Sequence, residues 1–145
     1  MIAQLTQNER RVFDLIWRKG PIARSDIADQ TGLTTGSVTR ITQGLLATGL
    51  LVETVVHNGA RGNPLRPLEV EPGGAYAFGV SFSHRHMEVG LVNLRGDLVG
   101  VVRRDFDEAR PEIIAATARE AIESLGAENG IDPRRVLGIG FAVPG

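Results

Sequence analysis

The chain has 145 residues, of which 42% are hydrophobic and 23% are charged, which suits one ordinary folded domain, or a small domain followed by part of another. It contains no Cys, which excludes disulfides and Cys-based zinc sites, and no apolar run approaches the roughly 20 residues of a membrane-spanning helix. The N-terminal stretch MIAQLTQNERR also lacks the hydrophobic segment of a secretory signal, so we expect a cytoplasmic protein.

Charge is distributed unevenly along the chain. Residues 1–66 hold eight Lys or Arg against five Asp or Glu, whereas residues 67–145 hold eight against twelve. The two parts are therefore expected to face different partners. The positive excess of the first part is by itself weak evidence for nucleic-acid binding.

Two helices are predicted before the first long polar segment. Thr6 followed three residues later by Glu9 matches the capping box, in which a hydroxyl and a carboxylate satisfy backbone N–H groups at the start of a helix. The apolar stripe of this first helix comprises Val12, Phe13, Leu15, Ile16 and Trp17. The helix is predicted to end at residues 19–21 (KGP). A second, shorter helix is predicted over residues 24–30, with Gly32 suited to the left-handed position after its end.

A third predicted helix, capped by Thr34, separates an apolar face from a small polar one. At 100° per residue, its inward side comprises Val38, Ile41, Thr42 and Leu45. Its other sides comprise Thr35, Gly36, Ser37, Thr39, Arg40, Gln43 and Ala47, and they contain no acid. A short helix, a turn that includes a Gly, and this longer helix together form a helix-turn-helix arrangement.

The outward side has the composition of a recognition helix for the major groove of DNA. Small residues allow close approach to the base edges, hydroxyls and amides can donate to phosphates and bases, and Arg can pair bidentately with guanine. We predict that Arg40 is the main base reader and that Gln43 is the next. The residues expected to position the helix on phosphates are Thr34, Thr35, Ser37 and Thr39. The alternative is an ordinary helix with a solvated polar side.

A β-hairpin is predicted to follow as the wing of a winged helix. Residues 50–56 are rich in β-branched side chains, residues 57–60 can turn the chain, and residues 65–70 can run back, although Pro64 and Pro67 weaken the second strand. The Arg-Gly segment at its tip can reach a minor groove or a phosphate, and an ordinary surface loop is the alternative. The predicted DNA-contacting residues are Arg24, Thr34, Thr35, Gly36, Ser37, Thr39, Arg40, Gln43, Arg61 and Arg66.

The second half predicts three strands, a helix and a further strand. The first three strands are expected over residues 76–83, 86–94 and 98–106. A helix is expected to begin at Pro111, and residues 136–143 form a nearly continuous apolar run that is typical of a buried strand. The predicted domains are a winged helix-turn-helix over residues 1–70, a linker over residues 71–75 and a second domain over residues 76–145.

These elements and their motifs resemble the N-terminal part of a ROK-family transcriptional regulator, a family named after repressor, open reading frame and kinase. The resemblance covers residues 5–145 and includes the helix-turn-helix segment LTQNERRVFDLIWRKGPIARSDIADQTGLTTGSVTRITQGLLATGLLVE. The segment GARGNPLRPLEV is similar to the family's GRGRP wing, with Asn63 in place of the second Arg. AFGVSFSHRHMEVGLVNLRGDLVG and LGIGFAVPG are similar to the first hairpin and the next strand of a sugar-kinase lobe.

This resemblance implies an α/β protein overall, with three helices and a β-wing followed by a partial actin-like (ribonuclease H-like) β-β-β-α-β unit. In family kinases an Asp-x-Gly-x-Thr loop approaches the phosphates of ATP, and the corresponding residues here are Ser81, Ser83 and Arg85. Ser81 lacks the carboxylate, and Ser83 adds a side chain where the backbone must approach phosphate. We therefore expect no enzyme activity and no catalytic residue. An anion site made of His84, Arg85 and His86 is less favoured than a solvated hairpin end.

The resemblance also implies that most of the family domain would follow Gly145. That part would carry a sugar-binding Glu-x-Gly-His segment, the catalytic Asp and a Cys-rich zinc site. We therefore expect a truncated chain without a cofactor or a metal of its own. We also expect it to associate through the unpaired edge of its last strand.

The leading functional hypothesis is a sequence-specific DNA-binding regulator that represses genes of carbohydrate uptake or catabolism. Two copies in a homo-oligomer would read a pseudo-palindromic operator in double-stranded DNA. A small sugar bound to the rest of the family domain would change their spacing or rigidity. The alternatives are a ROK sugar kinase with an added DNA-binding module, and a winged helix that docks a protein. No membrane partner is expected.

Overall fold

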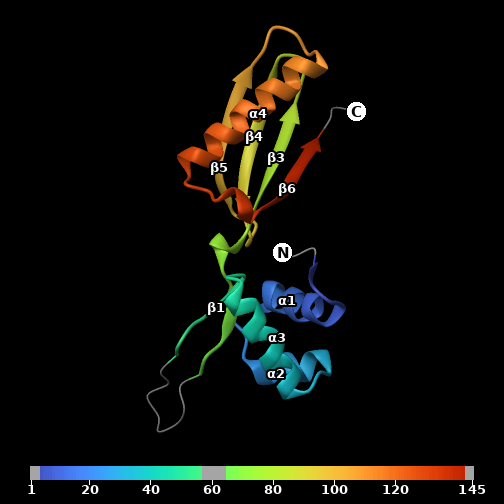
Figure 1. The fold of residues 1–145 in the computed structure, drawn as a ribbon, viewed down its shortest axis with the longest axis vertical. Helices are drawn as coiled ribbons and strands as arrows, with labels where there is room; N and C mark the ends of the chain where they lie inside the picture. Colours follow the sequence, from blue (N-terminus) through green and yellow to red (C-terminus); the bar gives the residue numbers. More distant parts are fainter. Residues whose placement is uncertain (1–3, 57–64, 143–145) are drawn as a thin grey trace. The chain divides into compact units, whose positions relative to one another are not determined.

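The computed structural model describes residues 4–56 and 65–142. Residue contacts divide the chain into two compact units, Met1–Gly74 and Ala75–Gly145 (Figure 1). No helix within the described residues is long and apolar enough to cross a membrane.

The N-terminal unit contains three helices and a small hairpin (Figure 1). The elements are α1 (Gln7–Lys19), α2 (Arg24–Thr31), α3 (Thr35–Ala47) and the antiparallel strands β1 (Leu51–Glu53) and β2 (Leu68–Val70). Ile22, between α1 and α2, exchanges two backbone hydrogen bonds with Leu68 and so pairs with the outer side of the hairpin. This order of helices and strands is the predicted winged helix-turn-helix.

The caps expected from the sequence begin and end these helices. The Thr6 hydroxyl accepts from the backbone N–H of Glu9 at 3.4 Å, and the Glu9 carboxylate accepts from the backbone N–H of Thr6 at 2.7 Å. The capping box is therefore complete. Gly32 follows α2 with a φ of 70°, in the left-handed region that suits glycine. Trp17 differs from expectation: it is 49% exposed, because the buried side of α1 is formed by Val12 and Ile16.

The hairpin is shorter than the sequence suggests. The paired strands cover three residues each; beyond them, the backbone N–H of Thr54 donates to the carbonyl of Pro67, and an isolated bridge joins Val56 and Leu65. Pro67 has no N–H to donate, which explains why regular pairing stops at the Glu53–Leu68 pair. The predicted turn over residues 57–60 and the predicted contact residue Arg61 lie outside the described residues.

The C-terminal unit is a four-stranded sheet with one helix packed on one face (Figure 1). Its elements are β3 (Tyr76–Phe82), β4 (His86–Asn93), β5 (Leu98–Asp105), α4 (Pro111–Glu128) and β6 (Val136–Ala142). The strand order is β5-β4-β3-β6, in which β3 pairs antiparallel with β4 and parallel with β6. The core between sheet and helix comprises Phe78, Val80, Met87, Val89, Leu91, Ala118, Ala121 and Leu125. The predicted β-β-β-α-β order is confirmed.

The apolar run predicts a buried last strand, which is wrong for this structure, whereas the unpaired edge expected of the same strand is present among the described residues. Strand β6 pairs with β3 on one side only, and Leu137, Ile139 and Phe141 are 48–59% exposed. The apolar run consists of side chains that are suited to burial on both faces of a sheet. Here they remain exposed to solvent, because β6 is an edge strand and α4 covers it only partly. An apolar groove of about 560 Å³ follows between α4 and β6, with Phe78 and Ile122 in its walls.

The segment predicted as a linker has regular structure. Residues 72–74 form a short 3₁₀-helix, η2 (Pro72–Gly74), in which Gly74 is buried. The backbone N–H of Glu71 donates to the carbonyl of Leu50 at 3.0 Å, which ties the start of this segment to the N-terminal unit.

A matched pair of leucines tests the core of the C-terminal unit. Leu91→Ala is expected to lower the free energy of unfolding by about 2–5 kcal/mol, because this fully buried side chain leaves a cavity. Leu98→Ala makes the same change at an exposed position of the neighbouring strand and should alter it by less than about 0.5 kcal/mol. Urea denaturation measures both, and equal losses would contradict the packing described.

Candidate nucleic-acid interface

Helix α3 presents the polar face that the sequence predicts. Its buried residues are Val38, Ile41, Thr42 and Leu45, and its exposed residues are Thr35, Gly36, Arg40, Gln43, Gly44 and Ala47. Ser37 and Thr39 are half-buried at the margins of the exposed face. The helix contains no acid, so nothing on it would repel a phosphate backbone.

The N-terminus of α3 is held by its own side chains. The Thr34 hydroxyl accepts from the backbone N–H of Ser37 at 3.2 Å and donates to the Ser37 hydroxyl at 3.0 Å. This is an N-cap, which fixes where the helix begins. Both hydroxyls are therefore oriented before any ligand arrives.

Two glycines in α3 have no internal packing role. A Cβ built on Gly36 or on Gly44 would have no neighbouring atom within 4 Å. Glycine inside a helix is less stable than alanine by roughly 0.5–1 kcal/mol, so the unit gives up stability at these positions without gaining contacts. Gly36 lies on the exposed face in the first turn of α3. Because it has no side chain, a binding partner can come close to the helix backbone there.

Arg40 differs from the other cations of the N-terminal unit. Each of the others that the structure describes has a partner within the chain. These others are Arg10, Arg11, Arg18, Lys19, Arg24 and Arg66. Among the described residues of this unit, Arg40 is the one Lys or Arg without a hydrogen bond or ion pair to the chain. Its guanidinium is available to an external acceptor.

The positive charge of Arg40 affects the pKa of Glu9. The pKa of Glu9 lies below its ordinary value, chiefly because the backbone N–H and the side chain of Thr6 hydrogen-bond to it, and to a smaller extent because of the positive charge of Arg40. The carboxylate thus stays ionised in the capping box, and Arg40 feels its attraction without pairing to it.

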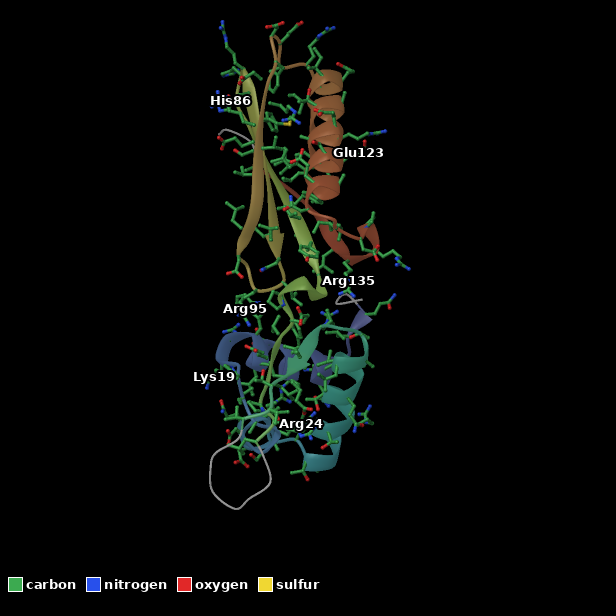
Figure 2. The ribbon with its side chains drawn as sticks, turned by 90° about the vertical axis from the view of Figure 1, so that its left-hand side faces the viewer. Lys19, Arg24, His86, Arg95, Glu123 and Arg135 are labelled. Atoms are coloured by element: carbon green, nitrogen blue, oxygen red, sulfur yellow. The ribbon has the colours of Figure 1, made fainter. Side chains whose placement is uncertain are left out.

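Arg24 and Arg66 converge on a residue that the sequence analysis did not single out. Arg24 Nη1 lies 2.6 Å from Glu53 Oε1, and Arg66 Nη1 lies 3.6 Å from Glu53 Oε2. Arg24 Nε also donates to the hydroxyl of Thr42 at 3.1 Å (Arg24 is labelled in Figure 2). These two predicted DNA-contacting arginines are therefore engaged between α2, the back of α3 and the hairpin.

One residue in the sequence, Thr42, indicates that such a cluster exists. Thr42 is a polar residue on the otherwise apolar inward side of α3, and it is fully buried. A buried hydroxyl needs a partner, and Thr42 has two: it donates to the carbonyl of Thr39 and accepts from Arg24. Glu53, 29 residues beyond Arg24, gives no comparable sign in the sequence.

In the C-terminal unit, the positions aligned with the kinase phosphate loop close a turn. Ser81 is exposed on β3, and the Ser83 hydroxyl lies 2.9 Å from His86 Nδ1. The backbone N–H of Ser83 donates to the carbonyl of His86, and the carbonyl of Arg85 accepts from Phe106. Over residues 4–56 and 65–142, no group of three or more His, Asp or Glu side chains is placed to hold a metal ion.

The fold and this face can be compared with known proteins. No family model matches the chain. The crystal structure of a ROK family transcriptional regulator, a homologue of the Escherichia coli MLC protein, superposes on 95% of the chain with a TM-score of 0.72 and 28% identity. The resemblance to the ROK family is confirmed. The chain covers 35% of that structure.

Relatives in sequence agree with the structural match to the ROK family. The protein y4fQ of Sinorhizobium fredii (strain NBRC 101917 / NGR234) is 34% identical over 145 residues, which are 100% of this chain and 37% of that protein. The transcriptional dual regulator NagC of Escherichia coli (strain K12) and the N-acetylglucosamine repressor of Escherichia coli O157:H7 are each 25% identical over 138 residues. Those residues are 95% of this chain and 34% of each relative. The chain thus spans 34–37% of the length of these three relatives.

The cap of α3 gives a prediction that does not depend on a ligand. Thr34→Ala should lower the free energy of unfolding of the N-terminal unit by about 1 kcal/mol, because the backbone N–H of Ser37 loses its acceptor. Thr34→Ser keeps an acceptor at the same place and should remain close to the parent. Thermal unfolding followed by circular dichroism measures the difference, and identical stability of Thr34→Ala and the parent would contradict a capping role.

Proposed function

We propose that the chain is the DNA-reading part of a transcriptional repressor of the ROK type. The observation that carries the proposal is Arg40, a cation without an internal partner on the acid-free exposed face of α3. The similarity to regulators named NagC and N-acetylglucosamine repressor supports it. Binding of a sugar by residues outside this chain, and control of carbohydrate genes, belong to the same proposal.

The proposed contacts follow from the geometry of α3. Arg40 pairs bidentately with a guanine in the major groove, and Gln43, one turn further along the same face, reads a neighbouring base. Gly36 lets the helix approach closely, and the hydroxyls of the first turns contact phosphates. The residues proposed to contact phosphates are Thr34, Thr35, Ser37 and Thr39. Arg61, which lies outside the described residues, is proposed to add a further contact, whereas Arg24 and Arg66 are held by Glu53.

A homo-oligomer would present two such faces to the two halves of a pseudo-palindromic operator. A recognition helix reads only a few base pairs, so a second copy is what gives an operator enough length to be selected. A sugar that favours one spacing of the two copies would then change operator affinity by population shift.

The proposal is tested by fluorescence anisotropy on duplexes from the region upstream of the protein's own gene, compared with scrambled duplexes over a salt series. Specific binding predicts a preference for one upstream duplex that survives moderate salt, and affinity that falls with salt through counterion release. Arg40→Ala should lose about 1–3 kcal/mol of that preference while keeping much of its salt-dependent binding to scrambled DNA. An unchanged preference would remove Arg40 from the base-reading role. Binding without a salt slope would point instead to a protein partner.

The two open glycines of α3 separate stability from recognition. Gly36→Ala and Gly44→Ala should each raise the free energy of unfolding by about 0.5–1 kcal/mol, because neither added methyl group meets another atom of the chain. Gly36→Ala alone should weaken binding to the preferred duplex about fivefold, or roughly 1 kcal/mol, because its methyl group meets the DNA. Urea denaturation and anisotropy measure the two effects. Equal affinities for the two variants would show that Gly36 does not face the DNA.

A further inference from the structure

The strongest unassigned cluster in the described residues is the bridge made by Glu53. Its carboxylate contacts two guanidinium groups through its two oxygens, at 2.6 Å from Arg24 and at 3.6 Å from Arg66. Glu53 ends β1, Arg24 begins α2, and Arg66 precedes β2. One side chain therefore joins the helical part of the unit to both sides of the hairpin.

The bridge continues into the recognition helix. Arg24 uses Nη1 for Glu53 and Nε for the hydroxyl of Thr42, which is fully buried. Thr42 lies on the back of α3, directly before Gln43 and two positions after Arg40. The rotation of α3 that presents Arg40 is thereby linked to the position of the hairpin.

The ion pair between Arg24 and Glu53 is partly shielded from solvent. The side chains of Arg24 and Glu53 are 28% and 23% exposed, in contrast to the Asp14–Arg18 pair of α1, whose side chains are 56% and 67% exposed. A partly buried, charge-assisted pair fixes geometry better than a solvated one, because water and salt screen it less. Arg24 also has two directed hydrogen bonds, which restrict its rotamers.

We propose that Glu53 is a positioning residue for DNA recognition, which sets the β1–β2 hairpin against α3 and keeps Arg24 and Arg66 away from DNA phosphates. This inference rests on the proposed DNA binding and deepens it. Glu53 offsets one of the two positive charges and holds both guanidinium groups at the hairpin, which lowers sequence-independent attraction, whereas the fixed geometry benefits the preferred sequence. Glu53 thus raises the ratio of specific to nonspecific affinity.

The test uses Glu53→Gln, which keeps the size of the side chain and removes its charge. Anisotropy over a salt series, on the preferred and the scrambled duplex, measures two quantities. The slope of log affinity against log salt should steepen by about 1–2, because Arg24 and Arg66 become free to contact phosphates. The affinity ratio between the two duplexes should fall at least about threefold, as expected for coupled residues of one network.

Asp14→Asn is the matched control. It also removes one acid and frees one arginine, Arg18, in the same unit, but it does not touch the link between α3 and the hairpin. Its affinity ratio should equal that of the parent. An equal fall of the ratio in both variants would make the effect one of general charge and overturn the positioning role.

Arg66→Gln keeps the inference testable if Glu53→Gln does not fold, because Arg66 is an exposed side chain whose loss leaves the Arg24 pair intact. The inference expects a lower affinity ratio with an unchanged salt slope. A slope that becomes shallower by about 1 would mean that Arg66 itself contacts a phosphate, which overturns it.

Measurements on the parent chain distinguish a failure of the proposed DNA binding from a failure of the positioning role. If the parent shows no sequence preference, the proposed function fails and this inference with it. If the parent shows a preference that Glu53→Gln retains in full, with the parent's salt slope, the positioning role alone is overturned.

Discussion

The buried side of α3 is the constraint on which the N-terminal unit depends. Val38, Ile41 and Leu45 fix the rotation of the helix about its axis by packing inward. Once that rotation is fixed, the positions of Arg40 and Gln43 on the opposite side follow from the helical period alone. The polar face proposed to contact DNA is thus a consequence of core packing, and its residues are selected only against disturbing the core.

Thr42 refines this arrangement, because hydrophobic packing alone does not choose between neighbouring rotations of a helix. A buried hydroxyl must form hydrogen bonds, and only one rotation of the helix places it within reach of its partners. Thr42 donates to the carbonyl of Thr39 and accepts from Arg24. The apolar contacts therefore supply most of the stability, while this hydrogen bond selects one geometry. Arg24 extends the selection to the hairpin through Glu53.

The sequence predicted the local structure well because its signals are local. The capping box of Thr6 and Glu9, the left-handed Gly32 and the N-cap of Thr34 each act within a few residues, and the structure contains all three. The strands of the C-terminal unit could also be predicted, because the hydrophobic periodicity of the sequence gives the order of the strands and of α4 along the chain.

Two features could not be read in the same way. The pairing of Glu53 with Arg24 and Arg66 depends on which surface charges the fold brings together, and no periodicity records that. The exposure of β6 depends on what covers its outer edge and faces, whereas its apolar sequence states only that such side chains are suited to burial. Both features depend on tertiary context, which the periodicity of the sequence does not record.

Which cations are paired within the N-terminal unit affects the proposed DNA binding in two ways: the affinity for any sequence and the preference for one sequence. Every free Lys or Arg near DNA adds affinity for any sequence, because it releases counterions wherever it binds. Ion pairs with Asp14 and Glu53 offset the charges of Arg18 and Arg24 and so lower that indiscriminate attraction without removing the residues' structural contacts. Arg40 is left unpaired at the position where a bidentate contact to a base can discriminate. If the proposed DNA binding holds, this modestly charged domain gains discrimination from where its charge is left free, more than from how much charge it carries.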